Sequence, residues 1–137
     1  MLELSGINIW AVLVVWVIYL IVGAYWYSPG GFAKLWTKYT GIDIMKIPTE
    51  KATKILISVT LSSLVQVLAL AIILNSLNVE TALQGFVAGI VLWLGFTTAT
   101  TVGVTLYSQR SWKFLWLNSA YFLVTMGVGS IIFAIWQ

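Results

Sequence analysis

The sequence predicts an all-α membrane protein, a four-helix transmembrane bundle with a short interfacial helix after the first span. Of its 137 residues, 61% are hydrophobic and only 8% are charged, whereas soluble domains contain about 25% charged residues. Four long apolar runs cross the chain, and all seven basic residues fall in two short segments between them. A soluble fold would lack the polar residues to cover its surface, so the chain belongs in a bilayer.

The first predicted span covers residues 7–27. Its roughly 21 residues would extend about 31 Å as a helix, which matches a hydrocarbon core of about 30 Å. The preceding residues include Glu3 and no Lys or Arg, and no small-residue cleavage site follows. We therefore expect a span that is retained rather than a signal peptide.

The segment 28–51 is predicted to be a cytoplasmic loop that contains the interfacial helix. Ser28 and Pro29 are expected to stop the first span and open this helix, and Gly41 to end it in a left-handed conformation. Lys34 and Lys38 lie off its apolar face, as is typical of a helix in the membrane interface. An ordered loop packed on the bundle is the alternative. The apolar face comprises Phe32, Leu35, Trp36 and Tyr39.

The remaining predicted spans cover residues 52–75, 79–107 and 112–136. A short polar turn at 75–78 joins the second and third spans, and a basic turn at 108–111 joins the third and fourth. Thr49, Asn78 and Ser111 are residue types that favour helix N-caps, and we expect them to cap spans two, three and four respectively.

The positive-inside rule sets the expected orientation. It assigns the two basic loops to the cytoplasm and both termini to the extracytoplasmic side of the plasma (inner) membrane. Glu3 and Glu80 then fall outside, where no Lys or Arg accompanies them. The basic residues are Lys34, Lys38, Lys46, Lys51, Lys54, Arg110 and Lys113.

The chain contains no Cys and no His, which excludes disulfides, thiolate or imidazole metal sites and catalytic devices that need these residues. No Asp, Glu, Lys or Arg lies in the middle of a span, unlike most proton-coupled carriers. Only Asp43, Lys46 and Glu50, near the inner surface, offer acid–base groups. We therefore expect no enzyme, no cofactor, no metal and no nucleic-acid partner.

Neutral polar residues are the remaining candidates for a pocket or pathway. They are Gln66 in span two, Thr97 and Thr101 in span three, and Asn118 and Ser119 in span four. The alternative is hydrogen bonding between helices, worth about 0.6–2 kcal/mol per bond, or threonine hydroxyls bonding back to their own helix. A shared pocket or pathway predicts that Gln66, Thr97 and Asn118 converge, and it is not supported if they face different directions.

Two further groups of residues suggest contacts with lipid or protein. Aromatic and basic side chains near the inner surface are typical of lipid-headgroup contact, and also of an ordinary aromatic belt with topological charges. They are Trp26, Lys34, Lys38, Arg110, Trp112 and Lys113. Gly85, Gly89 and Gly127 allow close helix approach, either inside one bundle or in a homo-oligomer or larger membrane complex.

Three strings carry a resemblance to a known family. They are GAYWYSP at 23–29, WLGF at 93–96 and RSWKFLWLNSAY at 110–121. Together they resemble the domain-of-unknown-function 1761 family of small four-span integral membrane proteins found widely in bacteria. The resemblance implies a four-helix membrane bundle; it implies no activity and no catalytic residues.

Two functional hypotheses follow. The first is a structural, accessory or self-associating membrane component, because the chain shows no catalytic chemistry and has small residues suited to helix association. The second is a small channel, carrier or lipid-binding protein that uses the neutral polar residues of spans two to four.

Overall fold

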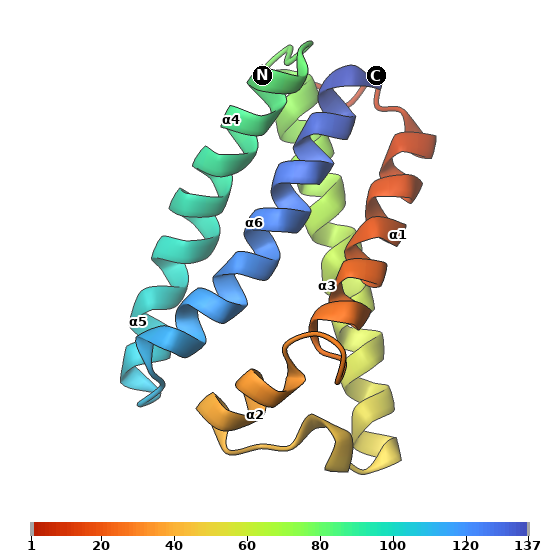
Figure 1. Cartoon of the computed structure of the whole chain (residues 1–137). Coiled ribbons are helices and arrows are strands. Elements are labelled where there is room, and N and C mark those ends of the chain that lie inside the picture. Colours follow the sequence, from red (N-terminus) through yellow and green to blue (C-terminus); the bar gives the residue numbers. More distant parts are fainter. Residues whose placement is uncertain (1, 137) are drawn as a thin grey trace.

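The computed structural model describes residues 2–136 and is helical throughout its regular structure. Four of its helical stretches are long and apolar enough to cross a membrane, with α4, η2 and α5 forming one stretch from Ala82 to Tyr107 (Figure 1). The four-helix prediction is thereby confirmed. The elements are α1 Ile9–Trp26, α2 Ala33–Thr40, the 3-10 helix η1 Ile44–Lys46, α3 Thr49–Ser76, α4 Ala82–Leu92, the π-helix η2 Trp93–Thr98, α5 Ala99–Tyr107 and α6 Trp112–Ile135.

Two of the predicted helix ends have the expected chemistry. The Ser111 hydroxyl accepts a hydrogen bond from the backbone N–H of Phe114, which caps α6 as predicted. Gly41 ends α2 with a φ of 74°, a left-handed conformation that a residue without Cβ adopts at little cost. The short helix after the first span therefore ends where the sequence indicated.

Two predicted caps, Thr49 and Asn78, are wrong, and Ser28 stops the first span as predicted but does not open the next helix. Thr49 is the first helical residue of α3, preceded by Pro48, and its side chain caps nothing. Asn78 adopts a φ of 52° in the turn, and the cap of α4 is Thr81, which forms a capping box with Gln84. Ser28 donates to the Tyr25 carbonyl at 2.7 Å, which closes the end of α1 instead of opening α2.

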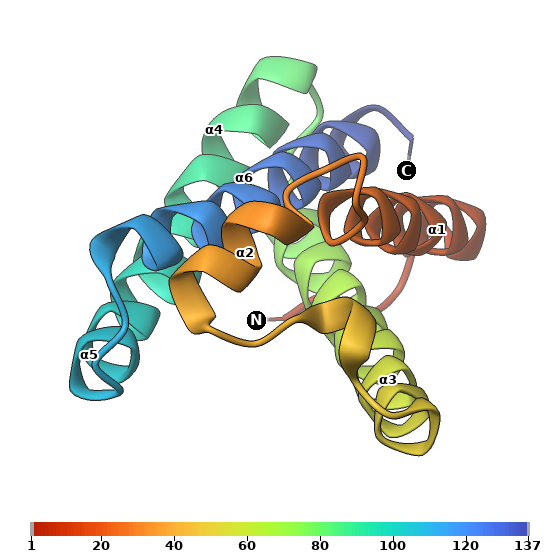
Figure 2. The same cartoon turned by 60° about the horizontal axis from the view of Figure 1, so that its bottom comes forward.

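Helix α6 lies at the centre of the bundle. It packs against α1, α3 and α4 (Figures 1 and 2). By contrast, α4 packs extensively only against α6 among these spans. Gly129 marks the point where α1, α3 and α6 meet, since a Cβ there would lie 2.9 Å from Val15 Cγ1 and 3.5 Å from Leu70 Cδ2. The core around it is built mainly of small aliphatic side chains.

The closest helix pair is α4 on α6, and it depends on glycine. A Cβ on Gly85 would lie 2.5 Å from the Ser130 carbonyl oxygen, and one on Gly89 would lie 2.7 Å from the Ser130 hydroxyl. Gly127, also buried, faces the Phe86 ring. These three glycines therefore serve packing inside one chain, and the alternative use between copies does not apply to Gly85 and Gly89, which α6 covers.

The two ends of the bundle carry different segments of the chain, and each end is held by its own hydrogen bonds. Both chain ends and the turn after α3 lie at one end, and α2 lies across the other (Figure 1). At the first end, Asn75 Nδ2 donates to the carbonyls of Glu3 at 3.0 Å and Ser5 at 2.9 Å. At the second end, Arg110 Nη1 donates to the Thr40 carbonyl at 2.6 Å, which joins the two basic loops.

Substitution of Gly85 by Ala is expected to destabilise the bundle by about 1–3 kcal/mol, because the new methyl group would overlap backbone atoms of α6 that cannot move aside. Gly103→Ala is the matched control: nothing lies within 4 Å of its Cβ position, and a change within about 0.5 kcal/mol is expected. Unfolding in mixed detergent micelles, followed by circular dichroism, measures both. Equal effects of the two substitutions would contradict the close α4–α6 contact.

Candidate functional site

A groove of about 470 Å³ lies between helices of the bundle. Its walls are α3 on one side and η2 with α5 on the other, and α6 forms its floor. Figure 2 shows α3 and α5 diverging toward the α2 end of the molecule. The lining residues are Ser58, Val59, Ser62, Ser63, Gln66, Phe96, Thr97, Thr100, Thr101, Tyr121 and Phe122.

At each wall of the groove, a tryptophan indole forms a hydrogen bond that links two helices. The Trp16 indole N–H of α1 donates to the Thr60 carbonyl at 3.3 Å and to the Ser63 hydroxyl at 3.1 Å, which ties α3 to α1. The Trp93 indole N–H donates to the Ser119 carbonyl at 2.7 Å, which ties η2 to α6. The two indole hydrogen bonds thus link the two walls to different helices.

The π-helix η2 shapes the second wall. Here the backbone pattern widens over the six residues Trp93–Thr98, and such a widening inserts a residue and reorients the turns that follow. Thr98 then faces α6, where its hydroxyl bonds the Ser119 hydroxyl, while Thr97, Thr100 and Thr101 line the groove. The string WLGF opens this π-helical segment.

Several hydroxyls of the groove donate to backbone carbonyls of their own helices. Ser58 donates to the Lys54 carbonyl at 2.9 Å, Thr100 to the Phe96 carbonyl at 2.8 Å, and Thr101 to the Thr97 carbonyl at 2.9 Å. This is the back-bonding expected for such residues in membrane helices. Each of these oxygens keeps a lone pair that can accept a further hydrogen bond.

The predicted polar residues divide into two sets. Gln66, Thr97 and Thr101 line the groove, but Asn118 and Ser119 do not. Asn118 Oδ1 accepts a hydrogen bond from the Tyr27 hydroxyl at 2.7 Å, and Ser119 is buried against Thr98. The prediction that all three of Gln66, Thr97 and Asn118 converge is therefore wrong for Asn118, and only Gln66 and Thr97 share the groove.

Several lining residues escaped the sequence analysis. Two of them, Ser58 and Ser62, recur with the predicted residue Gln66 at every fourth position of α3, a spacing that places all three on one helix face. That spacing is the signal that could have revealed the wall. Thr100 had a weaker signal, because the π-helix sets which of the threonines face the groove.

The groove is electrically neutral. Among residues 2–136, no Asp, Glu, Lys or Arg lines it, and its floor is the ring of Tyr121 beside Phe122. The Tyr121 hydroxyl points toward α1 and donates to the Tyr19 carbonyl at 3.2 Å. The site therefore combines aromatic surface with uncharged hydrogen-bonding groups, which suits an uncharged, partly apolar molecule.

The aromatic and basic residues proposed for headgroup contact do not form a single pocket. Lys34, Lys38, Trp112 and Lys113 are exposed around the α2 end of the bundle. Arg110 is engaged with the Thr40 carbonyl. Trp26 is turned inward, with its ring centroid 4.5 Å from that of Phe32 and its indole N–H buried.

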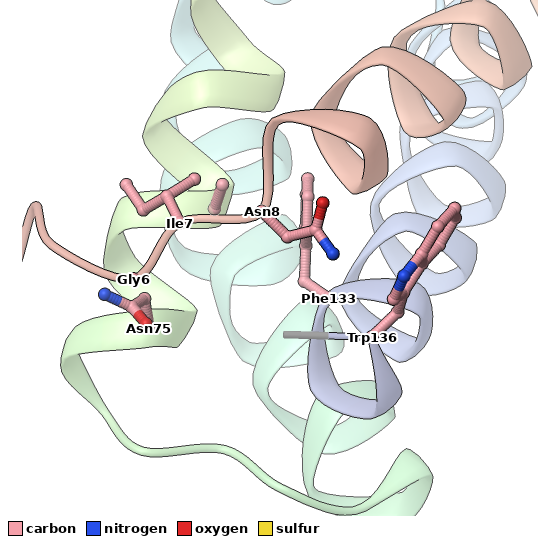
Figure 3. A pocket seen from close by; sticks show the side chains of 7 residues that line it. Gly6, Ile7, Asn8, Asn75, Phe133 and Trp136 are labelled. Atoms are coloured by element: carbon pink, nitrogen blue, oxygen red, sulfur yellow. The ribbon is translucent and has the colours of Figure 1, made fainter.

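A second cavity lies at the opposite end of the bundle, where Figure 3 shows Asn8, Asn75, Phe133 and Trp136 around it. Its volume of about 20 Å³ suffices for a single water molecule. The Asn8 side chain is already engaged as the N-cap of α1. This cavity is too small for a substrate.

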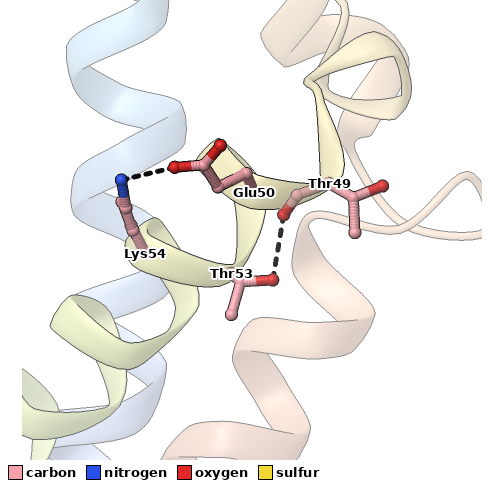
Figure 4. Close-up of polar contacts among 4 residues, drawn as sticks. All are labelled: Thr49, Glu50, Thr53 and Lys54. Carbon is pink, nitrogen blue, oxygen red and sulfur yellow. Dashed lines mark hydrogen bonds and ion pairs between the residues drawn. The ribbon is translucent and has the colours of Figure 1, made fainter.

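The acid–base residues near the α2 end form local ion pairs. Lys54 bonds Glu50 at 2.7 Å beside the Thr53–Thr49 hydrogen bond (Figure 4), and Lys46 lies 3.6 Å from Asp43. The side chains of Glu50 and Lys54 are more than 70% exposed, so this pair stabilises the fold by about 1 kcal/mol at most. None of the four charged residues lines the groove.

A family model described as "Protein of unknown function (DUF1761)" matches residues 10–134. The chain is a member of the DUF1761 family. No curated protein and no solved structure matches it. The match extends over all four spans of this DUF1761 member, including both walls and the floor of the groove.

The Tyr27–Asn118 hydrogen bond of this DUF1761 member is expected to couple the end of α1 to α6. A double-mutant cycle of Tyr27→Phe and Asn118→Ala should give a coupling energy of about 0.6 kcal/mol, the average measured for such hydrogen bonds in a membrane protein, and at most about 1.7 kcal/mol. Unfolding in mixed micelles supplies the four free energies. Additive effects of the two substitutions would show that the bond contributes nothing net.

Proposed function

We propose that this DUF1761 member is a small lipid-binding membrane protein whose ligand occupies the groove between α3 and α5. The groove carries this proposal, because its volume of about 470 Å³ lies within the range of about 300–1,000 Å³ typical of small-molecule sites. Aromatic side chains on its floor suit an apolar chain, and hydroxyl and amide groups on its walls suit a polar headgroup.

Binding is favoured over permeation by the length of the groove. Its polar positions on α3 run from Ser58 to Gln66, a rise of about 12 Å at 1.5 Å per residue. A pathway would have to cross a hydrocarbon core of about 30 Å. The polar lining thus suits a headgroup held at one depth better than a route through the membrane.

A structural or accessory role remains the second candidate. The glycines that suited self-association, Gly85 and Gly89, face α6 of the same chain, so a partner would have to use another surface. A second polypeptide that stays bound after gentle extraction would support this role instead of lipid binding.

We also propose that the protein lies in the plasma membrane and that both of its termini are extracytoplasmic. All seven basic residues belong to α2, η1, the first turns of α3 and the start of α6 with its preceding turn, all at the α2 end of the bundle. Basic residues that flank spans favour the cytoplasmic side.

Because the chain has no Cys, single cysteines test this orientation without background. Leu2→Cys, at the N-terminal end, is expected to react with a membrane-impermeant maleimide in intact cells, since Leu2 is 67% exposed. Gln109→Cys, in the turn before α6, is expected to react only after the membrane is opened. The reverse pattern of labelling would refute the proposed orientation.

Filling the groove should remove its lipid. Ser62→Trp adds an indole inside the groove, whereas Leu61→Trp changes the neighbouring residue, which is 58% exposed and does not line the groove. Native mass spectrometry after gentle extraction is expected to show a lipid adduct on the unsubstituted protein and on Leu61→Trp. The adduct on Ser62→Trp is expected to be at least fivefold weaker, which corresponds to a loss of binding free energy of about 1 kcal/mol or more. Equal adducts on all three proteins would contradict a lipid site in the groove.

A further inference from the structure

The hydrogen-bond chemistry of the groove points to one class of ligand. We propose that the groove binds a neutral glycerolipid that carries a free hydroxyl group, such as a diacylglycerol. This inference rests on the proposed lipid-binding function and specifies its ligand. It follows from which hydrogen-bonding groups the chain has already used and which it leaves facing the groove.

Acceptors are plentiful on the groove walls. The hydroxyl protons of Ser58, Thr100 and Thr101 are directed to backbone carbonyls of their own helices, at 2.8–2.9 Å. A hydroxyl with its proton engaged still has lone pairs that can accept. An acceptor away from water that meets no donor is unfavourable, so the ligand should bring at least one O–H or N–H.

Donors are few and are concentrated on α3. The Gln66 amide and the Ser62 hydroxyl line the groove, and neither makes a hydrogen bond to another residue in the range 2–136. An amide N–H₂ and a hydroxyl suit the ester carbonyls of a glycerolipid. The α3 wall thus matches ester oxygens, and the wall made by η2 and α5 matches a free hydroxyl.

A charged headgroup does not fit. The groove has no acidic or basic lining residue among those described. A phosphate or ammonium group placed beside these neutral groups would lose hydration without gaining a counter-ion. This favours an uncharged headgroup over that of a phospholipid.

The test compares dioctanoylglycerol with the same lipid acetylated on its free hydroxyl. The two lipids have the same acyl chains and differ in one hydrogen-bond donor. In native mass spectrometry titrations of the purified full chain, we expect dioctanoylglycerol to bind about three- to tenfold more tightly, the effect of one net hydrogen bond.

Matched variants locate the effect. Thr100→Val with Thr101→Val removes two groove acceptors and should abolish the preference for the free hydroxyl. Thr53→Val is the control, because Thr53 donates to the Thr49 carbonyl at 2.9 Å in the same way but lies outside the groove. Thr100→Ser with Thr101→Ser keeps both hydroxyls and should keep the preference, which separates loss of the acceptors from damage to the π-helix.

The possible outcomes distinguish failure of the hydroxyl-lipid assignment from failure of the proposed lipid-binding function. Equal binding of the two lipids, weakened by Ser62→Trp, would overturn the hydroxyl-lipid assignment and leave lipid binding intact. Binding of both lipids that Ser62→Trp does not change would overturn both proposals. A second copy of the chain, or another polypeptide, crosslinked from a photoreactive residue at position 62 would overturn both in favour of a protein partner.

Discussion

The close contact between α4 and α6 is the interaction on which the rest of the bundle depends. In a bilayer, the lipid chains are as apolar as the side chains, so helices associate through tight packing and through polar contacts. Gly85 and Gly89 allow the backbone of α4 to approach that of α6 at Ser130. This contact fixes one side of α6 and leaves its other faces for α1, α3 and the floor of the groove.

The groove follows from how the remaining helices attach to α6. Trp16 holds α3 to α1, and Trp93 holds η2 to α6, so the two walls have separate anchors. The π-helix then turns a set of threonines toward the space between them. The tight pair of α4 and α6 and the diverging pair of α3 and α5 are therefore parts of one packing arrangement around α6.

The spans could be predicted from sequence because hydrophobic length alone determines what can cross a bilayer. Ser111 and Gly41 could be predicted because each end offers one suitable residue. The cap of α4 could not, since Asn78 and Thr81 both favour caps and only the turn geometry selects Thr81. Gln66 and Thr97 were foreseen as polar positions, but the loop residue Tyr27, far away in sequence, decides where Asn118 points.

The back-bonded hydroxyls of the groove have a consequence for the energetics of the membrane. A relay of protons along hydroxyl groups requires each group to release one proton as it receives another. Ser58, Thr100 and Thr101 have their protons engaged with carbonyls of their own helices, and a carbonyl has no proton to pass on. A polar site of this construction can hold a headgroup within the bilayer without providing a conduction path that would dissipate a proton gradient.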